Sequence, residues 1–151
     1  MTSEQTAKLL EAAREAARNS YSPYSKFAVG AALLSDDGTV ITGCNVENAS
    51  FGLTNCAERT AIFKAVSEGR RSFLALAVAG GCAGAPATPC GACRQVIAEF
   101  CSEDMPVICV PLEGDDVLEF TAGELLPHGF DFVSGDPDKN ACTGKGEFKN
   151  G

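Results

Sequence analysis

The chain has 151 residues, of which 45% are hydrophobic, and its 20 acidic and 12 basic side chains give a net charge of −8 at pH 7. This length predicts one domain that buries about 68 to 70% of its unfolded surface without disulfides, and the acidic balance disfavours polyanions such as nucleic acid as partners. With no signal segment at the start and no apolar run of membrane-spanning length, we expect a cytoplasmic protein with reduced thiols and no membrane partner.

The first part of the chain alternates between helical and extended patterns. Apolar residues at helical spacing predict a helix over residues 3–18. A continuous apolar run over 27–34, typical of a strand buried on both faces, is followed by an Asp-Asp-Gly turn and a second extended run over 39–46, which together predict an antiparallel hairpin. Asn55 is placed to cap a helix over 56–68.

The pattern continues with a predicted strand over 72–80, a loop of small residues and prolines, and a helix over 90–101. Two further strands are predicted over 107–112 and 117–121, joined by a Glu-Gly-Asp turn. A short helix over 122–126 follows and ends at a proline.

Strands interspersed with helices predict an α/β fold, here a three-layer α/β/α sandwich with a mixed five-stranded sheet. From residue 134 onward the sequence is rich in Gly, Asp, Lys and Asn, which is typical of a flexible segment. We therefore expect a single domain over residues 1–133 and a flexible C-terminal tail over 134–151.

Two short blocks gather three thiols and one carboxylate, namely Cys56-Ala57-Glu58 and Pro89-Cys90-Gly91-Ala92-Cys93. Catalytic zinc takes three protein ligands and keeps a fourth position open for water, whose proton a nearby carboxylate can move. A structural zinc or simple core packing would explain a lone Cys-x-x-Cys better. The added Cys-x-Glu favours a catalytic zinc site with ligands Cys56, Cys90 and Cys93, and Glu58 beside them.

The spacing within each block predicts that both present their ligands from the start of a helix. Residues two apart point to different helix faces, so Cys56 and Glu58 can share a cavity only above a helix N-terminus. Cys90 and Cys93 are three apart, on one face of a first turn. Free N–H groups and the positive end of the helix dipole favour thiolates at that place.

Zinc with three thiolates carries a net charge of −1, which weakens the metal as a Lewis acid. Arg59 and Arg94 each lie beside a block and could withdraw charge from it. Our hypothesis is that Arg59 donates to a thiolate sulfur. The alternative is an arginine on a solvated helix face.

The remaining thiols are assigned no chemistry, because free Cys is among the most buried residue types and packs as a small hydrophobic residue. These cysteines are Cys44, Cys82, Cys101, Cys109 and Cys142.

Several stretches resemble one known family. They are residues 21–32 (YSPYSKFAVGAA), 43–49 (GCNVENA), 56–61 (CAERTA), 89–95 (PCGACRQ), and Leu125-Leu126-Pro127 with Phe130. Over about residues 9–130 the chain resembles the small, zinc-dependent, homotetrameric cytidine deaminases.

The resemblance implies hydrolytic deamination of cytidine and deoxycytidine to uridine and deoxyuridine, with release of ammonia, as in pyrimidine salvage. One Zn²⁺ per subunit would provide a bound hydroxide as nucleophile, and Glu58 would shuttle protons. A small nucleoside is the implied substrate, and a homotetramer with shared active sites is the implied assembly.

The resemblance also implies how the nucleoside is held. Phe27 stacks on the base, and Asn45 and Glu47 hold the ribose hydroxyls. The backbone of Ala57 helps position the base, and Phe130 approaches a site of another subunit. Residues two apart in a strand face the same side, which suits diol binding by Asn45 and Glu47. Without the family pattern these two would be an exposed polar strand end, and Phe27 would be a core residue.

The chain departs from the family at Phe51, where many relatives have Tyr, and over residues 131–151, which do not resemble the usual acidic ending. Both departures concern contacts between subunits rather than chemistry. Two alternatives stay open: a deaminase of a related cytosine nucleoside such as blasticidin S, and a non-catalytic zinc module in which Glu58 has no task. An editor of polynucleotides is disfavoured by the charge.

Overall fold

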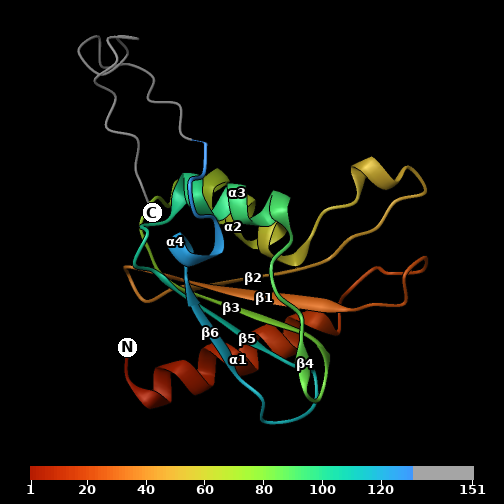
Figure 1. The fold of residues 1–151 in the computed structure, drawn as a ribbon, viewed down its shortest axis with the longest axis horizontal. Helices are drawn as coiled ribbons and strands as arrows, with labels where there is room; N and C mark the ends of the chain where they lie inside the picture. Colours follow the sequence, from red (N-terminus) through yellow and green to blue (C-terminus); the bar gives the residue numbers. More distant parts are fainter. Residues whose placement is uncertain (131–151) are drawn as a thin grey trace, which may run out of the picture.

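A central sheet separates one long helix from three others in the computed structural model, which describes residues 1–130 (Figure 1). Helix α1 (Ser3–Ala17) covers one face. Helices α2 (Ala57–Ser67), α3 (Gly91–Phe100) and α4 (Ala122–Leu125) cover the other. The three-layer α/β/α prediction is confirmed.

The sheet has the strand order β2-β1-β3-β5-β6, with a short β4 paired to β3. Its strands are β1 (Val29–Ser35), β2 (Val40–Cys44), β3 (Phe73–Cys82), β4 (Ala85–Pro86), β5 (Pro106–Val110) and β6 (Leu118–Thr121). β3 and β5 run parallel, whereas the other pairs, including the predicted hairpin of β1 and β2, are antiparallel. The mixed sheet is as predicted, except that β4 lies where the sequence indicated only a loop.

Strand β1 explains why its sequence is apolar throughout instead of alternating. Ala31 and Leu33 pack into a cluster with α2 and α3, while Ala32 and Leu34 pack on the opposite face against α1. Because successive side chains of a strand point to opposite faces, both sets must be apolar when helices cover both sides.

Close approach of the sheet to α2 depends on Gly43 in β2. A Cβ atom at this position would lie 2.5 Å from the backbone nitrogen of Ala61 and 2.7 Å from the carbonyl oxygen of Ala57. Only glycine therefore allows β2 to pass under the first turn of α2, the turn that carries Glu58.

Three local predictions are wrong. The first strand was predicted to start at residue 27, but β1 begins at Val29, so Phe27 precedes the strand and is 47% exposed. β2 ends at Cys44, so Asn45 and Glu47 lie beyond the strand and are not oriented by its alternation. The N-cap of α2 is Cys56 and not Asn55.

Two further expectations concern membrane-spanning helices and the state of the cysteines. Within residues 1–130, no helix combines the length and the apolar character that crossing a bilayer requires. Cysteines 44, 56, 82, 90, 93, 101 and 109 are all free; Cys109 is buried as predicted, but Cys82 is exposed. The predicted tail 134–151 and Cys142 lie outside the described residues.

Candidate functional site: a three-thiol metal centre

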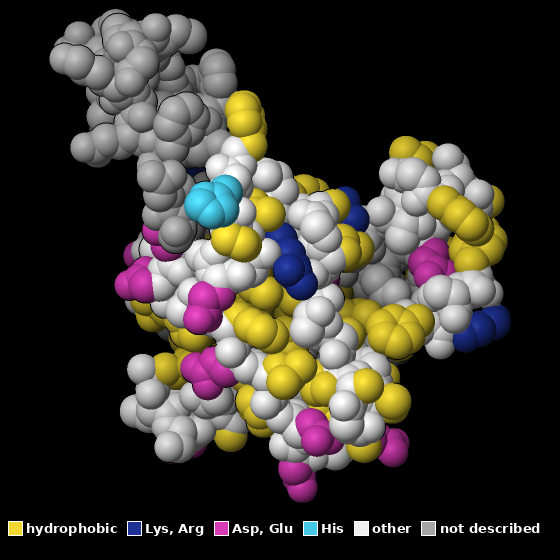
Figure 2. All heavy atoms as spheres, in the orientation of Figure 1, with side chains coloured by type: hydrophobic (Ala, Val, Ile, Leu, Met, Phe, Trp, Pro, Cys, Tyr) yellow, Lys and Arg dark blue, Asp and Glu magenta, His cyan; other side chains and the backbone are white. Residues whose placement is uncertain are grey.

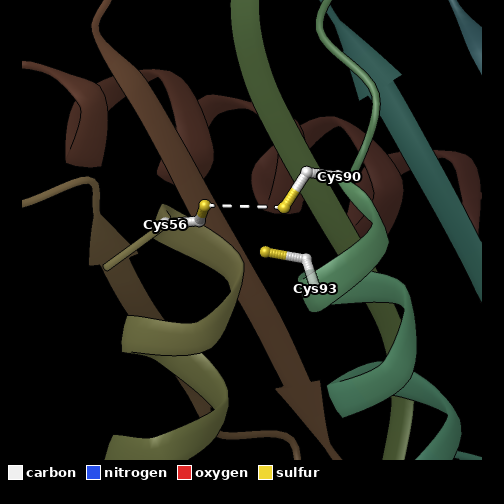
Figure 3. Close-up of side chains that lie close together, drawn as sticks. All are labelled: Cys56, Cys90 and Cys93. Atoms are coloured by element: carbon white, nitrogen blue, oxygen red, sulfur yellow. Dashed lines mark hydrogen bonds between the residues drawn. The ribbon is translucent and has the colours of Figure 1, made fainter. Parts of the chain in front are cut away.

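Three sulfur atoms converge where α2 and α3 begin. The Sγ atoms of Cys56, Cys90 and Cys93 all lie within 4.8 Å of one another, and those of Cys56 and Cys90 are 3.8 Å apart (Figure 3). Cys56 comes from the start of α2, and the other two come from the start of α3. The structure thus brings together the ligands that the sequence predicts.

Each helix begins at a cysteine. Cys56 is the N-cap of α2 and Cys90 the N-cap of α3, both with extended backbone, and neither side chain caps its own helix. Both side chains instead point toward the space between the two helix starts, and Cys93 points there from the first turn of α3. The positive ends of two helix dipoles meet at the sulfur cluster and favour negative charge there.

The proton affinities of the thiols are unequal. A hydrogen bond with Cys93 lowers the pKa of Cys56 to about 5, against the opposing effect of burial, and Arg59 lowers it further. The same hydrogen bond, together with burial and the neighbouring Glu58, raises the pKa of Cys93 above its usual range. In the absence of a metal, Cys56 therefore ionises more readily than Cys93. A divalent cation bound here would displace the remaining thiol protons and leave three thiolates.

The donor set fits zinc. With Zn–S distances of about 2.3 Å, two sulfur ligands of a tetrahedral site lie about 3.8 Å apart. The Cys56–Cys90 separation is 3.8 Å before any adjustment. Three thiolates suit Zn²⁺ in charge and softness and leave the fourth position open, as in catalytic zinc sites.

Glu58 lies one residue beyond the start of α2 and is the buried carboxylate of the site, with 4% of its surface exposed. Burial, followed by the charge of the nearby Cys56 thiolate, raises the pKa of the Glu58 carboxyl above its ordinary value, and a hydrogen bond with Cys93 acts in the opposite direction. A buried carboxyl group beside a metal centre, with its pKa raised, is suited to proton transfer.

The two arginines beside the blocks have different partners. The Nη2 atom of Arg59 donates to the Sγ atom of Cys56 at 3.2 Å. Arg94 instead donates to the carbonyl oxygens of Pro89, at 2.7 Å, and Leu125, at 3.2 Å, so it ties α3 to α4. Of the two, Arg59 has the geometry to withdraw charge from a thiolate.

Asn45 organises the chain beside the site. Its Oδ1 atom accepts from the Ser20 hydroxyl at 2.5 Å and from the Val29 N–H at 2.9 Å, and its Nδ2 atom donates to the Phe27 carbonyl at 2.7 Å. The side chain therefore joins the loop before β1 to the end of β2. One Nδ2 hydrogen is left for a ligand.

Glu47 holds the same loop from a second point. Its Oε1 atom accepts from the backbone N–H groups of Tyr24, at 3.0 Å, and Ser25, at 3.1 Å. The Ser25 side chain, followed by these amides, lowers the pKa of the Glu47 carboxyl, so the group is an anion at neutral pH. Both backbone hydrogen bonds go to one of the two carboxylate oxygens, Oε1.

A short backbone bridge connects this loop to the metal centre. Val46 and Asn55 exchange two hydrogen bonds, of 2.9 and 3.0 Å, and Asn55 is followed directly by Cys56. The chain that carries Asn45 and Glu47 is thus anchored next to a zinc ligand. Ser20 and Ser25, which complete the network, carry no chemical signal in the sequence beyond a turn-forming composition.

The other two predicted site residues, Ala57 and Phe130, differ in their exposure. Ala57 is fully buried as the first residue of α2. Phe130 follows α4, is 75% exposed, and is held by a hydrogen bond of 3.1 Å from Gln95 of α3 to its carbonyl oxygen.

Comparison with known proteins agrees with this site. Residues 3–109 match the family model described as the cytidine and deoxycytidylate deaminase zinc-binding region. A cytidine deaminase of Sporosarcina psychrophila is 58% identical over 82% of this chain and 89% of its own length.

Solved structures give the same answer for the fold. The crystal structure of cytidine deaminase from Burkholderia pseudomallei superimposes with a TM-score of 0.79 at 50% identity, covering 86% of this chain and all of the other. That of Mycobacterium tuberculosis gives 0.72 at 43% identity, covering 84% and 98%. With its mixed sheet and its three thiols at two helix starts, the chain belongs to the cytidine deaminase family of zinc-dependent enzymes.

Proposed function

We propose that this protein hydrolyses cytidine and deoxycytidine to uridine and deoxyuridine, releasing ammonia. The observation that carries the proposal is the buried Glu58 carboxyl beside three convergent thiols. Cys56, Cys90 and Cys93 would hold a zinc ion, which would supply the Lewis acidity that makes a water molecule nucleophilic near neutral pH. We propose one such ion per subunit and a single deaminase domain over residues 1–133.

Glu58 carries the protons of the reaction. Its carboxylate takes a proton from the water that attacks C4 of cytosine and delivers it to N3. It then passes the second proton of that water to the amino group, so that ammonia leaves and the C4 carbonyl forms. The raised pKa of this carboxyl supports the role, since an acid that must be reprotonated in each cycle works best near the operating pH.

The nucleoside is held by the residues of the loop network. Phe27, which is half exposed and lies two residues before β1, stacks on the base. Asn45 offers its remaining Nδ2 hydrogen, and Glu47 its second oxygen, to the ribose hydroxyls. The Ala57 N–H group, at the start of α2, faces the polar edge of the base.

A comparison of cytidine with cytidine monophosphate as substrates distinguishes a nucleoside deaminase from a nucleotide deaminase. Because Glu47 is an anion at the sugar, we expect kcat/KM for the monophosphate to be lower by about tenfold or more. The measurement is the loss of cytidine absorbance for each compound, with zinc content determined on the same sample. Equal turnover of both compounds contradicts the ribose assignment. Zinc without turnover of cytidine indicates either a non-catalytic module or a deaminase of another cytosine nucleoside, which blasticidin S then tests.

Arg59 is proposed to keep the three-thiolate centre acidic by withdrawing charge from Cys56. Replacing Arg59 with Gln removes the cation, and we expect zinc affinity or kcat to fall by about 10- to 100-fold. Lys64→Gln removes a cation from the exposed face of the same helix and is the matched control. If zinc content, rate and pH profile are unchanged in the Arg59 variant, the residue has no such role.

We propose a homotetramer with shared active sites, acting in the cytoplasm, where thiol ligands stay reduced. The support is a set of exposed apolar residues, of which two belong to the short 3-10 helix η1 (Phe51–Leu53) and one follows α4. Their exposed fractions are 75% for Phe51, 70% for Leu53 and 75% for Phe130. Figure 2 shows apolar side chains gathered on the projecting loops. Light scattering is expected to give the mass of four chains, and an active monomer at low concentration contradicts shared sites.

A further inference from the structure

Lys26, directly before Phe27, has a backbone conformation that is unfavourable for its residue type. Its φ angle is 58°, in the left-handed region, and among the described residues only His128 shares this property without being glycine. An L-residue with a long side chain enters this region only when surrounding contacts hold it there. The strain lies next to the residue proposed to stack on the base, so the contacts that maintain it decide where that ring lies.

Three hydrogen bonds hold the strained backbone. The Ser25 hydroxyl accepts from the Phe27 N–H at 3.0 Å, which spans Lys26. The Lys26 N–H donates to the Ser22 carbonyl at 3.0 Å. The Ser25 N–H donates to Oε1 of Glu47 at 3.1 Å. Ser25 therefore joins the backbone of Phe27 to the carboxylate of Glu47.

Phe27 is also fixed on its other side, because its carbonyl accepts from Asn45 at 2.7 Å. Two side chains thus bind the backbone of Phe27, namely Ser25 and Asn45. Asn45 is also proposed to bind the ribose, whereas Ser25 has no proposed contact with the substrate. We propose that the Ser25 hydroxyl and the left-handed backbone of Lys26 act together as a positioning device, which fixes the Phe27 ring relative to Glu47 and thereby sets the affinity for the nucleoside. This inference rests on the proposed function.

The exposure of the two residues makes the inference testable. The side chains of Ser25 and Lys26 are exposed, so their replacement removes little buried surface. The chemistry is performed elsewhere, at Glu58 and the thiol cluster. Loss of the device is therefore expected to raise KM and leave kcat nearly unchanged, whereas a general loss of folding lowers the active fraction and zinc content together.

The first experiment replaces the hydroxyl. We expect Ser25→Ala to raise KM for cytidine by about three- to tenfold, the range of one lost side-chain hydrogen bond, with kcat within about twofold. Ser25→Thr keeps the hydroxyl and should restore most of the affinity. If Ser25→Ala leaves KM unchanged, or if Ser25→Thr is as impaired as Ser25→Ala, the hydroxyl does not position Phe27.

The second experiment tests the backbone at constant charge. Lys26→Asn and Lys26→Val both remove the ammonium group, but Asn tolerates a left-handed conformation and a β-branched Val does not. We expect Lys26→Val to raise KM several-fold more than Lys26→Asn. Equal KM values for the two variants contradict the role of the backbone.

Failure of the inference is distinct from failure of the proposed function. If the unmodified protein, loaded with zinc, does not deaminate cytidine, the proposed function is wrong and the positioning device has no substrate to act on. If the unmodified protein is active and the Ser25 and Lys26 variants match it in KM, the function stands and the positioning device is wrong.

Discussion

Replacing Glu58 with Gln is expected to lower kcat for cytidine by about 10²- to 10⁴-fold while the zinc content stays unchanged. The amide has nearly the shape of the carboxyl group but cannot take a proton from water or deliver one to the base. Glu58 is 4% exposed and is not needed as a metal ligand beside three thiols. The loss should therefore fall on proton transfer and not on metal binding.

Glu68→Gln provides the matched control for this prediction, because Glu68 is an exposed carboxylate at the other end of the same helix. It should retain full activity. Zinc is measured by metal analysis and kcat by cytidine absorbance on the same samples. Substantial activity in the Glu58→Gln protein would remove this residue from the proton-transfer role, whatever the zinc content.

The second large effect is expected on replacing Cys90 with Ser. A serine hydroxyl is a poor ligand for Zn²⁺, so two thiolates remain where three are needed. We expect zinc affinity to fall by more than about 100-fold, beyond the loss typical of a change in the outer shell, and activity to fall with it. Competition with a chelator measures the affinity.

Cys82→Ser separates loss of the ligand from loss of any thiol. Cys82 and Cys90 are both exposed, so neither replacement creates a cavity in the core. The Cys82 variant should bind one zinc ion per chain with unchanged affinity. If both variants retain zinc, or if the Cys90 variant loses zinc without loss of activity, the three-thiol centre is not the catalytic site.

The sequence alone was sufficient for features with local causes. The ligands Cys90 and Cys93 are three residues apart at the start of one helix, directly after Pro89. Their relative placement is therefore set by a stretch of five residues. The hairpin of β1 and β2 similarly follows from its turn and two adjacent runs. Even the start of α2 was predicted, with an error of one residue in its cap.

Local reasoning failed where a residue's task is set by distant segments. Asn45 and Glu47 were predicted to share a strand face, but β2 ends before them and their orientation comes from hydrogen bonds to the loop before β1. Alternation assumes that a strand continues, but here the strand ends at Cys44, and Val46 instead forms isolated bridges with Tyr21 and Asn55. Those bridges join residues more than eight positions apart in the sequence. The spacing of apolar residues within a short window contains no information about such pairs.

What the sequence by itself determined is the donor chemistry: three thiols and a carboxylate in two blocks with helix-start spacing. Only the tertiary structure decided that Glu58 is buried, that Arg59 rather than Arg94 reaches a thiolate, and that Lys26 is held in a left-handed conformation. Burial, side-chain direction and backbone strain each depend on which distant segments surround a residue. The short-range spacing of the sequence specifies which groups are present, whereas packing of α2, α3 and the loop before β1 specifies what they can reach.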